Sequence, residues 1–123
     1  MPKEQNMDGN MTNDNLYTYT AEVIRVIDGD TLLVLIDCGF SVFKKERIRL
    51  ARINCPEMDT DDGKKAKEFV EENVKVGSTI MLYSKKKDSY GRYIGEVKFK
   101  DVTVDRNLSD FIINNQHAEL VTY

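Results

Sequence analysis

Arginine and aliphatic side chains alternate along RIRLARI, residues 47–53. A period of two is typical of a β-strand with one buried face, so this stretch predicts a strand with aliphatic side chains on one side and arginines on the other. The loop NCPE, residues 54–57, follows directly, and Pro56 stiffens the chain there. The other expected elements are arranged around this third strand.

Two strands are expected before it. Residues 17–27 are rich in β-branched and aromatic side chains, and residues 31–36 are nearly all aliphatic. Asp28-Gly29 lies between them and predicts a tight hairpin turn, because glycine and aspartate tolerate the positive φ that such turns need. Residues 1–16 are polar and are expected to form a disordered tail, which leaves 17–123 as a single domain.

A helix and two further strands are expected after the loop. The helix is capped by Asp61 or Asp62, and Ala66, Phe69, Val70 and Val74 follow at helical spacing, with Gly77 at its end. Strands are predicted over 79–83 and 93–99, and a short final helix begins at a Ser109 cap. The order β-β-β-α-β-β-α predicts a mainly β, α+β protein: a five-stranded OB-fold barrel with one main helix after the third strand.

Composition excludes several classes of protein. The 123 residues suit one core, two cysteines cannot form a disulfide scaffold, and no apolar run approaches the ~20 residues that cross a bilayer. The start of the chain has no apolar signal segment, so we expect a cytoplasmic protein with Cys38 and Cys55 as free thiols. The net charge is −3, from 18 basic and 21 acidic residues, which argues against a general nucleic-acid coat protein.

Four short features carry side chains suited to chemistry, and each also has a plain structural interpretation. Asp30 either tops a strand or presents a carboxylate to a hard cation such as Ca²⁺. Arg49 belongs either to a solvated strand face or to a phosphate clamp. The loop 54–57 is either a stiffened connection or a source of an amide oxygen, a backbone carbonyl and a carboxylate, the groups used in metal-assisted hydrolysis. DSYGR, residues 88–92, is either an ordinary hairpin or a second arginine beside a phenol.

Together these features resemble the staphylococcal nuclease (thermonuclease) family. The resemblance extends over roughly residues 20 to 118 and rests on four stretches in the family's order: VIDGDT at 26–31, RLARINCPE at 49–57, GKKAKEF at 63–69 and DSYGR at 88–92. It implies a five-stranded OB-fold barrel with packed helices. It also implies a calcium-dependent nuclease that hydrolyses DNA and RNA with little sequence preference.

The resemblance implies a calcium site and one departure from it. Asp30 would be the first ligand, Asn54 stands at the second, and the backbone carbonyl of Cys55 would be a third. The family normally has an aspartate where this chain has Asn54, whose oxygen carries no charge, so the metal should be held less tightly and activity weakened. The alternative function is therefore a weakly active or non-catalytic module that binds nucleic acid or protein.

The resemblance also assigns the groups that act on the substrate. Glu57 would orient or deprotonate the attacking water, Arg49 and Arg92 would hold the scissile phosphate, and Tyr90 would contact the nucleotide. DNA and RNA are then the expected partners and a membrane is not. We expect a monomer by default, although the apolar residues around Leu120 and Val121 leave room for a partner or a second copy.

The basic residues are unevenly distributed along the chain. Five lie in the third-strand region and four flank the Tyr90 hairpin: Lys44, Lys45, Arg47, Arg49 and Arg52, then Lys85, Lys86, Lys87 and Arg92. If the barrel brings these two segments together, half of the positive charge borders one phosphate site. A negative net charge for the whole chain is then compatible with a local basic cleft.

Overall fold

The computed structural model describes residues 17–87 and 91–121, so the predicted tail and Tyr90 lie outside the described residues. Five strands form a closed mixed barrel: β2 (Thr18–Asp28), β3 (Thr31–Asp37), β4 (Phe43–Leu50), β6 (Thr79–Lys87) and β7 (Tyr93–Asp101). Neighbours pair antiparallel in the order β4-β3-β2-β6-β7, and a parallel pairing of β4 with β7 closes the barrel. The mainly β, OB-fold-like α+β prediction is confirmed.

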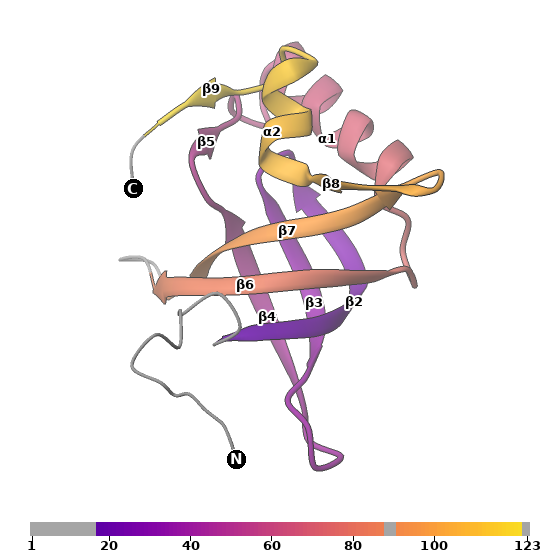
Figure 1. The fold of residues 1–123 in the computed structure, drawn as a ribbon. Coiled ribbons are helices and arrows are strands. Elements are labelled where there is room, and N and C mark those ends of the chain that lie inside the picture. Colours follow the sequence, from indigo (N-terminus) through magenta and orange to yellow (C-terminus); the bar gives the residue numbers. More distant parts are fainter. Residues whose placement is uncertain (1–16, 88–90, 122–123) are drawn as a thin grey trace, which may run out of the picture.

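The remaining described elements gather at one end of the barrel (Figure 1). They are α1 (Asp61–Asn73), α2 (Leu108–Asn114), the short strand β8 (Val104–Asn107) along β7, and the pair β5 (Ile53–Asn54) and β9 (Glu119–Leu120). At the opposite end the β3–β4 hairpin projects away from the barrel (Figure 1). The two ends of the molecule therefore differ: one is built up by helices, and the other is a bare two-stranded ribbon.

The β2–β3 turn has a different reason for its glycine from the one predicted. Asp28 pairs with Thr31, so Gly29 and Asp30 form the turn, and Gly29 does not adopt a positive φ. A Cβ atom at Gly29 would instead lie 2.8 Å from Cys55 Sγ and 2.9 Å from the Cβ of Ala66. Glycine is required here because α1 and the loop after β5 pack directly against the turn.

The third strand starts earlier and ends sooner than the sequence pattern indicates. β4 begins at Phe43 and stops at Leu50, because Arg52 adopts a left-handed φ of 69° that breaks the alternation. The chain resumes extended structure at Ile53, in β5. Ile48 and Leu50 are buried in the barrel, as the period of two predicts.

The N-terminal caps of both helices differ from the predicted residues by one or two positions. Thr60, not Asp61 or Asp62, caps α1, with Oγ1 accepting a hydrogen bond of 3.0 Å from Gly63 N. Asn107, not Ser109, caps α2. The aspartates instead lie in the first turn of α1, where the helix dipole favours acids, and buried Ser109 donates from Oγ to Ala51 O at 2.7 Å.

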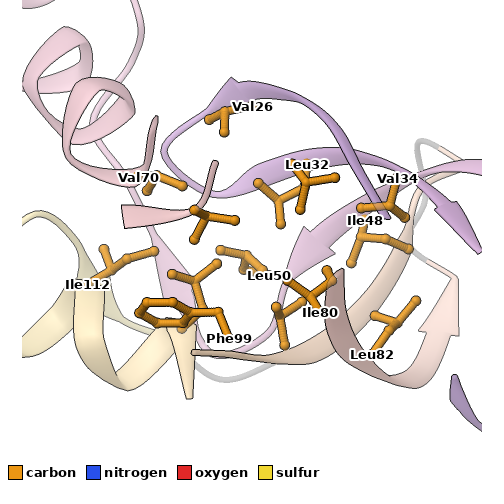
Figure 2. Packing of buried hydrophobic residues seen from close by; sticks show 14 of the residues in the cluster. Val26, Leu32, Val34, Ile48, Leu50, Val70, Ile80, Leu82, Phe99 and Ile112 are labelled. Atoms are coloured by element: carbon orange, nitrogen blue, oxygen red, sulfur yellow. The ribbon is translucent and has the colours of Figure 1, made fainter. Parts of the chain in front are cut away.

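One apolar core joins the barrel to the helices. Figure 2 shows aliphatic side chains of the barrel strands packed continuously toward Val70 of α1 and Ile112 of α2, with Phe99 of β7 beside them. These residues are almost completely removed from solvent. The core thereby holds the helical end of the molecule rigidly against the turn that carries Asp30.

Candidate functional site

Asp30 is a buried carboxylate at the β2–β3 turn. Its Oδ2 accepts a hydrogen bond of 2.9 Å from Cys55 N, and its Oδ1 accepts one of 3.2 Å from Thr31 Oγ1. Burial, helped by hydrogen bonding to Asp28, raises the pKa of Asp30 to about 6, although the Cys55 amide and Arg49 oppose the shift. The carboxylate is thus fixed in position and its negative charge is only partly compensated.

Arg49 is buried beside this carboxylate, because it pairs in register with Thr31 across β3 and β4. Its Nη2 lies 3.4 Å from Asp30 Oδ2 and 3.2 Å from Asn54 Oδ1, to which it donates, while Nη1 donates to Leu50 O at 3.0 Å. A cationic group therefore already occupies the space between two oxygens that the sequence resemblance assigns to a metal. Asp30, Arg49 and Asn54 converge on one point.

Backbone hydrogen bonds fix the segment that links Arg49 to Asn54. Leu50 N donates to Asp30 O at 2.8 Å, Ala51 N donates to Gly95 O at 2.9 Å, and Arg52 O accepts from Val121 N at 2.8 Å. Each bond joins the segment to a different part of the fold. As a result Arg49 and Asn54, which flank the segment, are held at a constant separation.

Arg52 does not lie with Arg49 at the candidate site, although the alternation of arginines in the sequence groups the two together. Its guanidinium donates to Glu96 at 2.6 and 2.9 Å, to Asp110 at 2.8 Å and to Asn107 at 3.2 Å. It therefore connects the β4–β5 turn to β7 and α2. The local alternation of arginines could not distinguish this structural arginine from Arg49.

Cys55 contributes its backbone rather than its thiol to the site. The side chain is buried under Gly29, and this burial raises the pKa of the thiol to about 12, so a reactive thiolate does not form at neutral pH. The amide of Cys55 holds Asp30. A metal-ligand role for its carbonyl stays a prediction.

Glu57 lies in the same connection, two residues after Cys55, with an exposed side chain. Its carboxylate has no hydrogen bond or ion pair with the residues that the structure describes. Its backbone is fixed, because the carbonyl accepts from Thr60 N at 3.0 Å and from Thr60 Oγ1 at 2.6 Å, and a Cβ on Gly63 would collide with it. The carboxylate is thus exposed to solvent, on the connection that carries Asn54 and Cys55.

Barrel closure brings the two basic segments together at β4 and β7. Tyr93 pairs with Ile48, which places Arg92 just before the paired stretch. Lys44 Nζ and Lys87 Nζ lie 5.5 and 5.3 Å from the Tyr93 ring centroid, one from each segment. Lys44 and Lys87, one from each segment, therefore lie against the same aromatic ring, whereas Tyr90 lies outside the described residues.

A groove of about 500 Å³ adjoins the cluster and was not foreseen. It runs from Asn54 and Pro56 past the first turn of α1 to the loop before β9, where His117 lines it. The His117 ring stacks on Phe69 with centroids 4.5 Å apart. No sequence signal marked His117, because its aromatic partner lies 48 positions earlier in the chain.

The donor groups at the cluster are oxygens of mixed type. Within residues 17–87 and 91–121 there is no group of three or more His, Cys, Asp or Glu that could hold a metal ion. Nor does any helix in that part of the chain have the length and apolarity needed to span a membrane. A cation at this site would depend on Asp30 together with amide and carbonyl oxygens.

Comparisons with known proteins show what this chain is similar to. A family model described as "Staphylococcal nuclease homologue" matches residues 47–122. Two curated proteins, from Escherichia coli O157:H7 and Escherichia coli, are each named "Uncharacterized endonuclease" and are 33% identical over 91 residues. The alignment covers 74% of this chain and 54% of each relative, so the chain spans about half the length of the curated proteins it matches.

Proposed function

Because the chain belongs to the staphylococcal nuclease homologue family, we propose that it is a calcium-dependent phosphodiesterase that cleaves DNA and RNA with little sequence preference. The description of the family and the names of the two relatives both support a nuclease function. The observation that carries the proposal is the convergence of Asp30, Arg49 and Asn54 on one point, with Glu57 on the same connection. The activity and the substrates of the whole protein are part of what we propose.

The proposed reaction is hydrolysis of a phosphodiester. Water attacks phosphorus, its proton passes to the Glu57 carboxylate, and the bond from phosphorus to the leaving oxygen breaks. The leaving oxygen takes a proton from solvent and departs as a hydroxyl group. Arg49 and Arg92 would hold the non-bridging oxygens, on which negative charge accumulates in the transition state. Tyr90 would contact the nucleotide. The exposure of Glu57 supports its role, because a base must be able to reach the attacking water.

The residues present fit a hard cation that is weakly held. The Asp30 carboxylate, the Asn54 amide oxygen and the Cys55 carbonyl are oxygen donors of the kind that Ca²⁺ prefers, and Arg49 already places positive charge between the first two. Bound calcium would supply further positive charge to the phosphate oxygens. Only Asp30 brings a formal negative charge, so water molecules and substrate would have to complete the coordination shell.

The decisive experiment measures cleavage of fluorescent single-stranded DNA, duplex DNA and RNA between about pH 7 and 10, with Ca²⁺ and with a chelator. Glu57→Gln should lower the rate by at least about 100-fold, because it removes the proton acceptor. The matched control is Glu72→Gln, a change of an exposed glutamate on α1. Equal rates for the two variants, or cleavage unaffected by the chelator, would contradict the proposal.

A non-catalytic module is the second candidate, and the uncharged Asn54 favours it. This function predicts nucleic-acid or protein binding without turnover. Asn54→Asp should then create or greatly raise calcium-dependent cleavage, since it restores a charged ligand. If the wild-type chain already cleaves and Asn54→Asp leaves its rate unchanged, this second candidate is wrong.

A further inference from the structure

The tip of the β3–β4 hairpin is an ordered, solvent-exposed apolar surface. Phe40 is fully exposed, and Val42 and Phe43 are more than half exposed. Scattered exposed hydrophobic residues are normal, but three at the end of one projecting ribbon mark a contact surface (Figure 1). We call residues 37–47, the part of the hairpin that carries this tip, the arm.

The backbone holds Phe40 outward in a defined turn. Cys38 N donates to Val42 O at 2.8 Å, Val42 N donates to Gly39 O at 2.9 Å, and Asp37 Oδ1 accepts from Gly39 N at 2.9 Å. Gly39, Phe40 and Ser41 all have left-handed φ values, of 80°, 56° and 62°. An aromatic residue in this conformation is unfavourable, and such outliers persist mainly where they serve a function.

One face of β4 leads from this tip to the candidate site. The register between β3 and β4 runs from Thr31–Arg49 to Asp37–Phe43 without a bulge. Alternate residues of β4 therefore share a face, so Phe43, Lys45 and Arg47 follow Arg49 along it. The distance from Arg49 to Phe43 is roughly 20 Å at the usual strand rise.

The cations on this face are available to a ligand. Lys45 and Arg47 are exposed and form no ion pair with any described residue. Lys44, on the opposite face, is instead paired with Glu46 at 2.9 Å. Same-face residues of a strand are ~6.6 Å apart, a spacing that suits successive phosphates of an extended nucleic-acid strand.

We propose that the arm binds a single-stranded segment of the nucleic-acid substrate on one side of the scissile phosphate. The strand leaves Arg49, its phosphates contact Arg47 and Lys45, and an unpaired base stacks on Phe40. About three nucleotides cover this distance. The inference rests on the proposed function, since it takes Arg49 to hold the scissile phosphate. Two unpaired cations aligned with that site favour a polyanion over an uncharged protein surface as the occupant.

The test measures binding of labelled single-stranded DNA of about 3 and about 12 nucleotides in chelator, where no cleavage is expected, over a salt series. Phe40→Asn keeps a residue that tolerates a left-handed φ, so the turn is preserved. Val76→Asn is the matched control, at another exposed apolar residue, in the loop after α1. Phe40→Asn should weaken binding of the longer strand at least about 5-fold and leave the short strand unaffected.

The charges are tested by the double variant Lys45→Ala/Arg47→Ala. It should reduce the slope of log K against log salt by about 1.4 for the longer strand, because two phosphate contacts are lost. Lys75→Ala/Lys100→Ala, on other surfaces, should leave the slope unchanged. Extending the short strand on one side only should restore sensitivity to Phe40→Asn, and extension on the other side should not.

Three outcomes would contradict the proposal that the arm binds single-stranded nucleic acid. They are equal binding by Phe40→Asn and Val76→Asn, no binding of the longer strand by the wild type, and a Phe40-dependent self-association or vesicle binding with unchanged DNA affinity. The nuclease proposal fails separately. If Phe40 controls binding but nothing is cleaved with Ca²⁺, the proposed binding by the arm is supported and the proposed nuclease activity is wrong. If cleavage persists and does not depend on the arm, the nuclease proposal is supported and the arm proposal is wrong.

Discussion

Asp30 is a single residue whose buried charge lowers the stability of the folded state. Its carboxylate is buried, touches one arginine at 3.4 Å and accepts one backbone amide. Selection for stability alone would not keep a partly compensated charge at a buried position. The position makes sense if the carboxylate must meet a cation, which would compensate the remaining charge.

Asp30→Asn should therefore stabilise the fold at neutral pH. The folded pKa of Asp30 is about 6, above the ordinary 3.8, so the folded state binds the proton more tightly. The wild type then loses stability as pH rises from about 4 to 6, by up to about 3 kcal/mol, and the loss persists at higher pH. Urea unfolding between about pH 4 and 8 checks this: the variant should gain over the wild type only above about pH 4.

Asp28→Asn serves as the comparison, since Asp28 is the neighbouring carboxylate and its removal lowers the cost of ionising Asp30. A stabilisation by Asp30→Asn that is the same at pH 4 and pH 8 would contradict the charge argument. Added calcium should raise the unfolding temperature of the wild type and not that of Asp30→Asn, because only the folded wild type offers the charged ligand.

At the scale of elements, the β4–β5 turn carries both strain and a compensating network. Arg52 has a φ of 69°, and its guanidinium joins this turn to Glu96 of β7 and Asp110 of α2. The left-handed conformation costs an ordinary residue about 1 kcal/mol. The network offsets that cost and fixes α2 relative to the segment that carries Arg49 and Asn54.

Replacing Arg52 separates the strain from the contacts. Arg52→Ala loses the ion pairs and keeps the strain, so it should destabilise the fold by about 2 kcal/mol. Arg52→Gly loses the same contacts but relieves the strain, and should cost about 1 kcal/mol less than alanine. Urea unfolding measures both. Arg106→Ala, which removes an exposed ion pair with Asp101 at 2.7 Å, is the control and should cost at most about 1 kcal/mol. Alanine and glycine variants of equal stability would refute the strain argument.

At the scale of the whole molecule, closure of the barrel brings segments together that are distant in the sequence. β4 and β7 are far apart in sequence, yet their parallel pairing aligns Arg49 with Ile94 and Leu50 with Gly95. It also brings basic residues from both segments to the Tyr93 ring. A chain with a net charge of −3 thereby acquires a local cluster of basic residues.

Gly95 makes the close pairing of β7 with β6 sterically possible, and it also pairs with Leu50 where β7 meets β4. A Cβ there would lie 2.9 Å from both Leu82 Cδ1 and Tyr83 O, although Gly95 has no positive φ. Gly95→Ala should cost about 1–3 kcal/mol of unfolding free energy and shift β7 relative to β6, and because β7 also pairs with β4 the cleavage rate should fall as well. Gly77→Ala is the matched control: its φ of 88° imposes strain, but nothing lies within 4 Å of the new Cβ. Both variants should lose stability, and only Gly95→Ala should lose activity in the folded state.

Local patterns in the sequence are enough to predict the periodic elements and the residue types of the candidate site. Alternation in 47–53 identified a strand, helical spacing identified α1, and the short stretches around Asp30 and residues 49–57 identified the family. These features are local, because a strand face or a helix face is set by the spacing of a few neighbouring side chains. The caps and strand ends were misplaced by a few positions, where competing local hydrogen bonds decide the boundary.

Which side chains contact one another depends on the tertiary structure. Arg49 and Arg52 share one local pattern, yet the first lies between Asp30 and Asn54 and the second binds Glu96, 44 positions away. In the same way, Gly29 is required by packing against Cys55 and Ala66 and not by its own φ. These partners come from strands and helices paired over long sequence separations. Their identity depends on register and barrel closure, which no stretch of neighbouring residues encodes alone.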